Sequence, residues 1–201
     1  MWRGGILGDH ELGRDLTVGV LGGLGPEATV DFMAKVLAAT GAATDQEHLH
    51  LLVDCNPKVP NRNDAIAGKG PSPSPDLVAM ARRLEAAGAD FLVMACNAAH
   101  AYAADISTSV RIPFVSIIDE TVTALQRDLP GLEAVAVLAA GGCRMAQLYE
   151  NALAAHGIRP VSPDEDEQAQ LMQAIYAIKA GRAASTKGGL LALSETLIRR
   201  G

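Results

Sequence analysis

The chain is poor in cysteine and in aromatic residues. Its 201 residues include three cysteines, Cys55, Cys96 and Cys143, and only 3% are Phe, Trp or Tyr. The cysteines lie far apart and none forms a CxxC pair, which argues against a disulfide framework and against a zinc site or other metal centre. A reducing, cytoplasmic compartment fits this usage. Because 49% of the residues are apolar, we still expect a sizeable core, built from Ala, Val, Leu and Ile.

The chain also lacks a basic stripe and long apolar runs. Its formal net charge is −6, and no segment gathers the lysines and arginines that nucleic-acid binding requires. No apolar run approaches the roughly 20 residues of a membrane-spanning helix. The first ten residues contain no apolar stretch typical of a signal peptide. We therefore expect no nucleic-acid or membrane partner, and we interpret residues 1–16 as an N-terminal extension.

What the sequence does contain is a regular alternation of apolar strands and helical segments. The expected strands cover residues 17–21, 49–54, 91–95, 112–117 and 134–138. The expected helices cover about residues 28–39, 76–87, 120–128 and 190–200, with a short one ending near 103. Segments 55–63 and 68–75, rich in Pro, Gly, Asn or Ser, are predicted to be loops. This alternation predicts the α/β class, with parallel sheets covered by helices on both faces.

The most informative segment runs from Gly88 to His100. Its apolar part, residues 91–95, predicts a buried strand that delivers Cys96 to its carboxyl end, where open α/β sheets bind ligands. A helix beginning there favours a thiolate through its dipole. The alternative is a small buried cysteine that only fills space, as most cysteines outside disulfides do. His100 follows one helical turn later and could support thiol chemistry.

Two stretches of the chain resemble each other. Residues 18–26 and 135–143 each predict a strand, a glycine-rich turn and the start of a helix. We therefore expect two similar lobes, residues 17–117 and 118–201. In the first, helix 76–87 precedes the Cys96 strand. In the second, the matching helix 190–200 is followed only by Gly201, so we expect this lobe to be truncated at its C-terminus.

A few polar groups outside the Cys96 segment could bind a small anion. Gly22 and Gly23 form a turn at a helix N-terminus, which can bind carboxylate or phosphate, although such a turn also simply lets strand and helix approach closely. Arg62 follows a strand end and can hold a carboxylate bidentately, although loop arginines are more often solvated. Lys179 ends a helix, where a lysine often only complements the dipole.

Three further features have plainer interpretations. The acidic run Asp164–Glu167 is interpreted as a helix start rather than a metal cluster. Cys55 follows a strand end as Cys96 does, but we interpret it as a packing residue. Cys143 lies in the second glycine-rich turn, where it could come close to a ligand.

Five stretches, in order and at matching spacings, resemble the cofactor-independent aspartate/glutamate racemases. They are residues 19–29, 56–62, 86–100, 163–168 and 178–181. The resemblance extends from about Thr17 to the end of the chain. It implies a two-lobed, pseudosymmetric α/β fold with the active site in the cleft between the lobes. It also implies an amino-acid racemase that needs no pyridoxal phosphate or other cofactor.

In that family two cysteines flank the substrate Cα. One, as thiolate, removes the proton, and the other, as thiol, delivers one to the opposite face. The resemblance makes Cys96 the first-lobe cysteine and Arg62 the clamp of a substrate carboxylate. It places further substrate contacts at Asn61, Asn63, Asn97, Ala98, Ala99 and Lys179.

The chain departs from the family pattern at several points. The second family cysteine belongs to a motif beyond residue 201, and Ala98 stands where threonine is usual. Cys55 replaces a residue that is often asparagine, and Cys143 one that is commonly threonine. Two alternatives therefore stay open: a one-cysteine decarboxylase or isomerase of a small dicarboxylate, and a non-catalytic carboxylate-binding homologue. The substrates of the family differ by one methylene, so the sequence leaves the choice between them open. A homodimer is expected from the family alone.

Overall fold

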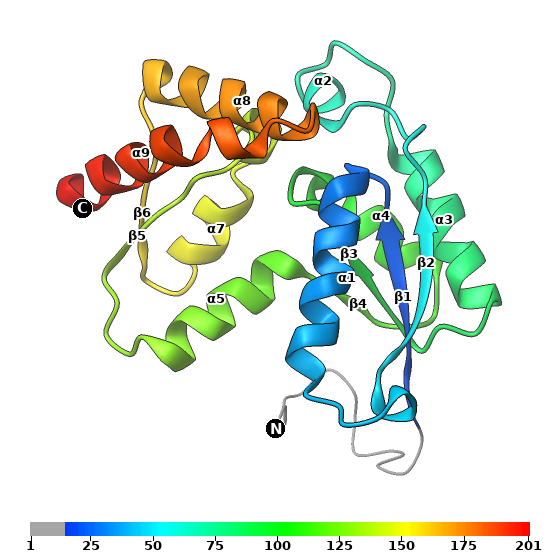
Figure 1. Cartoon of the computed structure of the whole chain (residues 1–201). Coiled ribbons are helices and arrows are strands. Elements are labelled where there is room, and N and C mark those ends of the chain that lie inside the picture. Colours follow the sequence, from blue (N-terminus) through cyan, green and yellow to red (C-terminus); the bar gives the residue numbers. More distant parts are fainter. Residues whose placement is uncertain (1–14) are drawn as a thin grey trace. The chain divides into compact units, whose positions relative to one another are not determined.

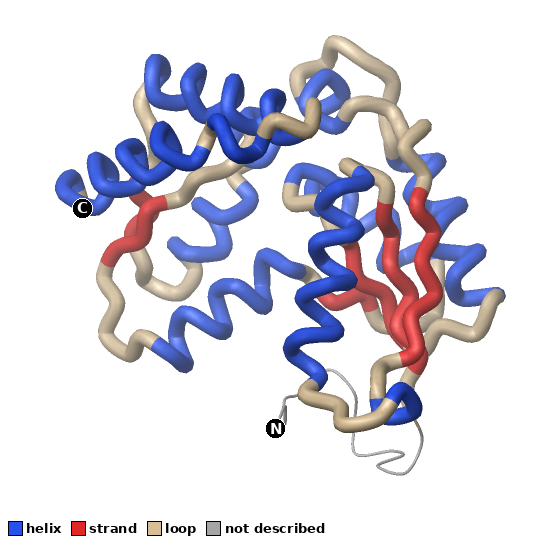
Figure 2. The backbone as a smooth tube through the Cα atoms, viewed as in Figure 1, coloured by secondary structure: helices blue, strands red, loops and turns tan. Residues whose placement is uncertain are grey.

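Residues 15–201 are described by a computed structural model in which helices alternate with parallel strands (Figures 1 and 2). Residues 1–14, most of the expected N-terminal extension, lie outside the described part. The contacts divide the chain into two compact units. One contains the chain up to Pro60 together with Ser72–Ile117, and the other contains Asn61–Pro71 together with Ile118–Gly201. Segment 61–71, which the expected lobe limits assign to the first lobe, thus makes its contacts within the second unit.

The first unit is built on one four-stranded sheet in the order β2-β1-β3-β4, and every neighbouring pair is parallel. Its strands are β1 (Thr17–Gly22), β2 (His50–Cys55), β3 (Phe91–Met94) and β4 (Phe114–Val115). Its helices are α1 (Pro26–Thr40), α3 (Ser74–Ala86) and α4 (Ala103–Ser109), with 3₁₀ helices η1 (Asp45–Glu47) and η2 (Ala98–Tyr102). The predicted α/β alternation and parallel pairing are confirmed.

The strand order explains how the helices cover this sheet. The chain moves outward from β1 to β2, returns past β1 to β3, and continues to β4. Because βαβ crossovers are right-handed, the reversal places α1 on one face and α3 with α4 on the other, as Figure 1 shows. Helix α3 turns a stripe at helical spacing toward the sheet. The buried residues of this stripe are Leu77, Met80, Ala81 and Leu84.

The second unit is built on two parallel strands, β5 (Ala134–Ala136) and β6 (Arg159–Val161). Six α-helices and a 3₁₀ helix accompany them in the described residues. They are α2 (Arg62–Ile66), α5 (Ile117–Asp128), α6 (Gly141–Met145), α7 (Leu148–Ala154), α8 (Glu165–Lys179), η3 (Ala183–Ser185) and α9 (Lys187–Arg200).

Strand alternation divides the core of this unit into two layers. Ala134 and Ala136 pack against a cluster from β6, α8 and α9 that contains Val161, Leu171, Leu193 and Leu197. Val135 packs with the opposite cluster, which contains Val122 of α5, Leu153 of α7 and Ile158. Successive side chains of a strand point to opposite faces, so even this short strand is covered on both sides. Each unit thus has the parallel sheet flanked by helices that the sequence predicts.

Some element limits differ from those expected. The expected loop 55–63 ends in helix α2, which begins at Arg62. The expected loop 68–75 ends at Ser74, where α3 begins, because Pro75 fits the first turn of a helix. Of the expected strand 112–117, only β4 pairs, since Pro113 has no N–H to donate and Ile117 already begins α5.

Candidate active site

Cys96 lies at the carboxyl edge of the first unit's sheet. The N–H of Ala95 donates to the carbonyl of Leu21 at 3.2 Å, which continues the pairing of β1 and β3 by one residue. Cys96 follows directly and is half-buried. The strand order reverses between β1 and β3, and open α/β sheets bind ligands at such a switch point. The thiol therefore has the strand-end position that the sequence predicts.

A buried histidine fixes the backbone of Cys96. His100 is 6% exposed, its Nε2 accepts the N–H of Ile117 at 3.1 Å, and its Nδ1 lies 2.9 Å from the carbonyl oxygen of Cys96. Because Nε2 accepts a hydrogen bond, the proton of the neutral ring sits on Nδ1 and is donated to that carbonyl. Phe114 packs on the ring at 5.5 Å between centroids. His100 thus supports the cysteine through its backbone.

The segment after Cys96 is the 3₁₀ helix η2, and α4 follows from Ala103. The expected helix ending near residue 103 is therefore a tighter turn, with less aligned backbone dipole than an α-helix. Asn97 is exposed, whereas Ala98 is 7% and Ala99 0% exposed. Ala99 anchors the turn in the core, so Asn97 is the one of these three that presents its side chain to solvent.

The turn after β1 is held together by its own hydrogen bonds. Gly23 donates its N–H to the buried hydroxyl of Thr29 at 2.9 Å, and Asn56 donates to the carbonyl of Gly22 at 3.2 Å. Gly23 has a φ of 80°, in the region that favours glycine. Gly22 leaves room for Thr29, whose methyl carbon would lie 2.6 Å from an added Cβ. The turn thus serves the close approach of strand and helix, and the Gly23 donor is directed at Thr29.

The three residues Asn61, Arg62 and Asn63 have three different environments. Asn61 caps α2, because its side-chain oxygen accepts the N–H of Asn63 at 3.0 Å. Arg62 is the first residue of α2 and is half-buried. The side-chain oxygen of Asn63 accepts the N–H of Gly142, 79 residues away, at 2.9 Å. All three belong to the second unit by contacts.

Two further predicted residues lie in the second unit. Lys179 is the last residue of α8 and is exposed, with its Nζ 5.9 Å from the ring centre of Tyr176. Cys143 is the third residue of α6 and is 0% exposed. Near it, the pKa of Tyr149 is raised, mainly by burial and to a smaller degree by the neighbouring Cys143 thiol.

A family model for Asp/Glu/Hydantoin racemases matches residues 21–201. The chain belongs to this family. The match covers both glycine-rich turns, the Cys96 segment and the second unit's helices, so the resemblance stated from the five stretches is confirmed.

Individual racemases agree with this assignment. The broad specificity amino-acid racemase RacX of Bacillus subtilis (strain 168) is 29% identical over 166 residues, which are 81% of this chain and 70% of that protein. The structure of Picrophilus torridus aspartate racemase matches with a TM-score of 0.81 and 28% identity, over 89% of this chain and 74% of that one. An aspartate racemase homologue from Pyrococcus horikoshii OT3 shares the fold, with a TM-score of 0.70 and 23% identity over 90% and 78% of the chains.

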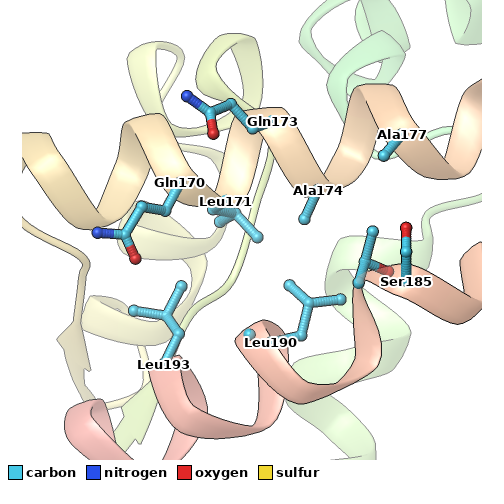
Figure 3. Close-up of a pocket in the computed structure, with 10 residues that line it drawn as sticks. Gln170, Leu171, Gln173, Ala174, Ala177, Ser185, Leu190 and Leu193 are labelled. Atoms are coloured by element: carbon cyan, nitrogen blue, oxygen red, sulfur yellow. The ribbon is translucent and has the colours of Figure 1, made fainter.

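The second unit also has a small cavity away from the predicted residues. It measures about 290 Å³ and lies between α8 and α9. In Figure 3, Leu171 comes from one helix and Leu190 and Leu193 from the other, and Gln170 and Ser185 also line the cavity. None of the residues predicted to bind substrate or to act in catalysis lines it.

Metal-binding clusters and membrane-spanning helices are both absent among residues 15–201. These residues contain no group of three or more His, Cys, Asp or Glu side chains that could hold a metal ion. No helix among them has the length and the apolar character needed to cross a membrane. The sequence did not reveal two supporting residues, Thr29 and Gly142. Thr29 accepts the N–H of Gly23 and Gly142 donates to Asn63, and no local sequence pattern indicates either contact.

Proposed function

We propose that this chain is an amino-acid racemase of the aspartate or glutamate type that uses Cys96 for proton transfer at Cα, without pyridoxal phosphate. One observation carries the proposal. In a member of a racemase family, the half-buried Cys96 stands at the switch point of a parallel sheet, with its carbonyl held by a neutral, buried His100. The likeness to an aspartate racemase at 28% identity supports the substrate class.

The chemistry requires a base and a positive environment. Cys96 as thiolate takes the α-proton, which leaves a carbanion beside a carboxylate. Such an intermediate is very unstable, so electrostatic stabilisation has to supply much of the barrier reduction. Arg62 is suited to a bidentate pair with a carboxylate, and Lys179 and Asn97 offer further donors on exposed side chains. Asn61 caps the helix that begins at Arg62, and Ala99 anchors the turn that follows Cys96 in the core.

Hydrogen exchange at Cα tests the proposal directly. Both enantiomers of aspartate and of glutamate are incubated in D₂O, and loss of the α-proton is followed by NMR together with the enantiomer ratio. We expect exchange by the unmodified protein and its loss in Cys96→Ser. Cys55→Ser is the matched control, because Cys55 also ends a parallel strand of the same sheet. Cys55 lies two strands from Cys96, roughly 10 Å away, and is expected to keep full activity. Equal activity in both variants would refute the role of Cys96.

The second proton carrier distinguishes the racemase from a one-cysteine relative. Cys143 is 0% exposed, which favours packing over proton delivery to a substrate, and we expect Cys143→Ser to keep its ratio of inversion to exchange. Exchange with inversion would show a second acid, whereas exchange with retention would show that Cys96 works on one face only. Carboxylate binding without any exchange, unaffected by Cys96→Ala, would identify a binding homologue. A homodimer and a cytoplasmic location stay predictions.

A further inference from the structure

Arg62 stands at the start of a helix that cannot fix its own orientation. Helix α2 has five residues, Arg62–Ile66, and none of them is fully buried. Isolated helices are marginal in water below about 12–15 residues. The direction in which Arg62 is held must therefore come from contacts outside α2.

One side of that support is local. Asn61 caps the helix with its side-chain oxygen, which accepts the N–H of Asn63 at 3.0 Å. This cap fixes where α2 begins, because it satisfies one of the N–H groups left without an intrahelical partner. It does not fix where the helix sits on the second unit.

The other side of that support is remote in sequence. Helix α6 begins after Ala140, which has no side-chain oxygen with which to cap it. Its first two N–H groups are satisfied instead by side chains from elsewhere. Gly141 donates to the sulfur of Met172 at 3.2 Å, and Gly142 donates to the side-chain oxygen of Asn63 at 2.9 Å. Asn63 therefore caps α6 from 79 residues away.

The fit between the two helices is close. Gly142 is buried, and a Cβ added there would lie 2.5 Å from the side-chain oxygen of Asn63 and 3.2 Å from the Cδ1 of Ile66. A Cβ added at Gly141 would meet only the sulfur of Met172, at 3.8 Å. Glycine is therefore required at position 142 if α2 is to pack against α6, whereas position 141 has room for a side chain.

The turn at the start of α6, residues 139–141, is hydrogen-bonded to α8. Gln168 donates its side-chain N–H to the carbonyl of Ala139 at 3.1 Å, and Met172, which receives the Gly141 N–H, lies one turn further along α8. Lys179 ends that helix. The two cationic side chains assigned to the substrate, Arg62 and Lys179, therefore belong to one hydrogen-bonded framework of α2, α6 and α8.

We infer that Asn63 is a positioning residue, which holds Arg62 in its carboxylate-binding orientation by capping α6 at Gly142. The inference rests on the proposed function, and it gives Asn63 a different role from the direct substrate contact that the family resemblance implies. The amide oxygen of Asn63 is engaged by the backbone N–H of Gly142, and it is through this contact that Asn63 acts on Arg62 in the inferred role.

The kinetic test compares Asn63→Ala, Asn63→Asp, Arg62→Ala and the double variant R62A/N63A, with the KM and kcat of aspartate α-proton exchange as readouts. A hydrogen bond of ordinary strength predicts a rise in KM of about threefold to tenfold for Asn63→Ala, with little change in kcat. Asn63→Asp keeps the acceptor, so the Gly142 amide should stay protected from exchange in that variant, whereas its KM also reflects the new negative charge beside Arg62. In the Arg62→Ala background, the additional Asn63→Ala substitution should cause no further rise in KM, because the side chain that Asn63 positions has already been removed.

A matched glycine pair tests the same contact from the other side. Gly142→Ala should raise KM as Asn63→Ala does, whereas Gly141→Ala should leave it unchanged. Neither glycine has a positive φ, so the two substitutions differ mainly in the space around the new methyl group. Amide hydrogen exchange supplies a readout without substrate: the Gly142 amide should exchange faster in Asn63→Ala than in the unmodified protein.

The outcomes separate the inference from the proposed function. If the unmodified protein exchanges no α-proton, the racemase proposal falls, and the Gly142 amide decides whether Asn63 still caps α6. If Arg62→Ala raises KM and Asn63→Ala does not, the inference is overturned while the function stands. It is also overturned if the effects of the two substitutions multiply in the double variant, or if the Gly142 amide exchanges equally fast with and without Asn63.

Discussion

Substituting Gly23 by alanine should destabilise the first unit, although the change adds only one methyl group. Gly23 follows β1 with a φ of 80°. An alanine there has to adopt a left-handed conformation, and its Cβ would overlap the backbone of Asn56, lying 2.5 Å from that residue's carbonyl carbon. The obstacle is main chain at the end of β2 rather than the tip of a flexible side chain, so it cannot move aside without disturbing the β1–β2 pairing.

The magnitude follows from these two effects. The left-handed conformation costs an alanine about 1–2 kcal/mol, and overpacking in a well-packed region typically costs about 1–3 kcal/mol. The lower entropy of the unfolded alanine chain offsets about 0.4–1 kcal/mol. We therefore expect the free energy of unfolding to fall by roughly 1–5 kcal/mol, which is a large fraction of the total stability of a domain.

Gly25→Ala in the same turn is the matched control. Gly25 is the N-cap of α1 with a φ of −126°, and an added Cβ there has no atom within 4 Å. Alanine is a poorer N-cap than glycine, but the lower entropy of the unfolded alanine chain offsets part of that cost, so the unfolding free energy should change by about 1 kcal/mol or less. Urea denaturation followed by circular dichroism measures both variants, with equal m-values confirming that the same surface unfolds. If Gly23→Ala were as stable as Gly25→Ala, the packing explanation of this turn would be wrong.

Two further predictions concern the second unit. Arg200 of α9 pairs with Glu167 and holds the pKa of that carboxyl below its ordinary value; the stabilisation is therefore present above the ordinary carboxyl pKa and is lost as pH falls through the lowered one. Glu167→Gln removes the charge but can keep the helix cap. In thermal unfolding this variant should have a lower Tm than the unmodified protein at neutral pH, and the two Tm values should become equal in acid. A Tm difference that did not change with pH would contradict the ion pair. Leu197→Ala, at a 0% exposed core position, should lower the unfolding free energy by about 2–5 kcal/mol. Its neighbour Ile198, 71% exposed, should tolerate alanine within about 0.5 kcal/mol, and equal losses in urea titrations would refute this division of α9.

Much of the fold could be predicted because its signals are local. Helix α3 shows its buried face as a helical spacing from Leu77 to Leu84, and the structure buries those residues. The strand of Cys96 shows as an apolar run bounded by Gly88 and polar residues. Strand β4 was overestimated for a physical reason: an apolar stretch is compatible with pairing, but Pro113 cannot donate a ladder hydrogen bond. Short apolar runs do not reveal where pairing stops.

The glycine-rich turns show where sequence reasoning reaches its limit. The pattern after β1 predicts a tight turn at a helix start, and this is what forms. Whether such a turn binds an anion depends on where its N–H groups point, and at Gly23 the donor points to the buried hydroxyl of Thr29. A threonine six residues away gives no sign of this in the sequence, because a helical threonine is usually unremarkable.

The segment from Asn61 to Asn63 shows the same limit of prediction from sequence, because two identical side chains on either side of Arg62 make different contacts. Asn61 is bonded to an N–H two residues away, so a capping pattern could have revealed it. Asn63 is bonded to an N–H 79 residues away, and only the folded chain brings that partner to it. A resemblance to relatives treats both as part of one substrate-binding loop, because it compares residues and not their contacts. The hydrogen bonds instead divide the loop into a local cap, a cation suited to carboxylate and a remote anchor. Loss of the hydrogen bond between Asn63 and Gly142 should therefore weaken substrate binding only while Arg62 is present. For this reason the double variant of Arg62 and Asn63 is more informative than either single substitution.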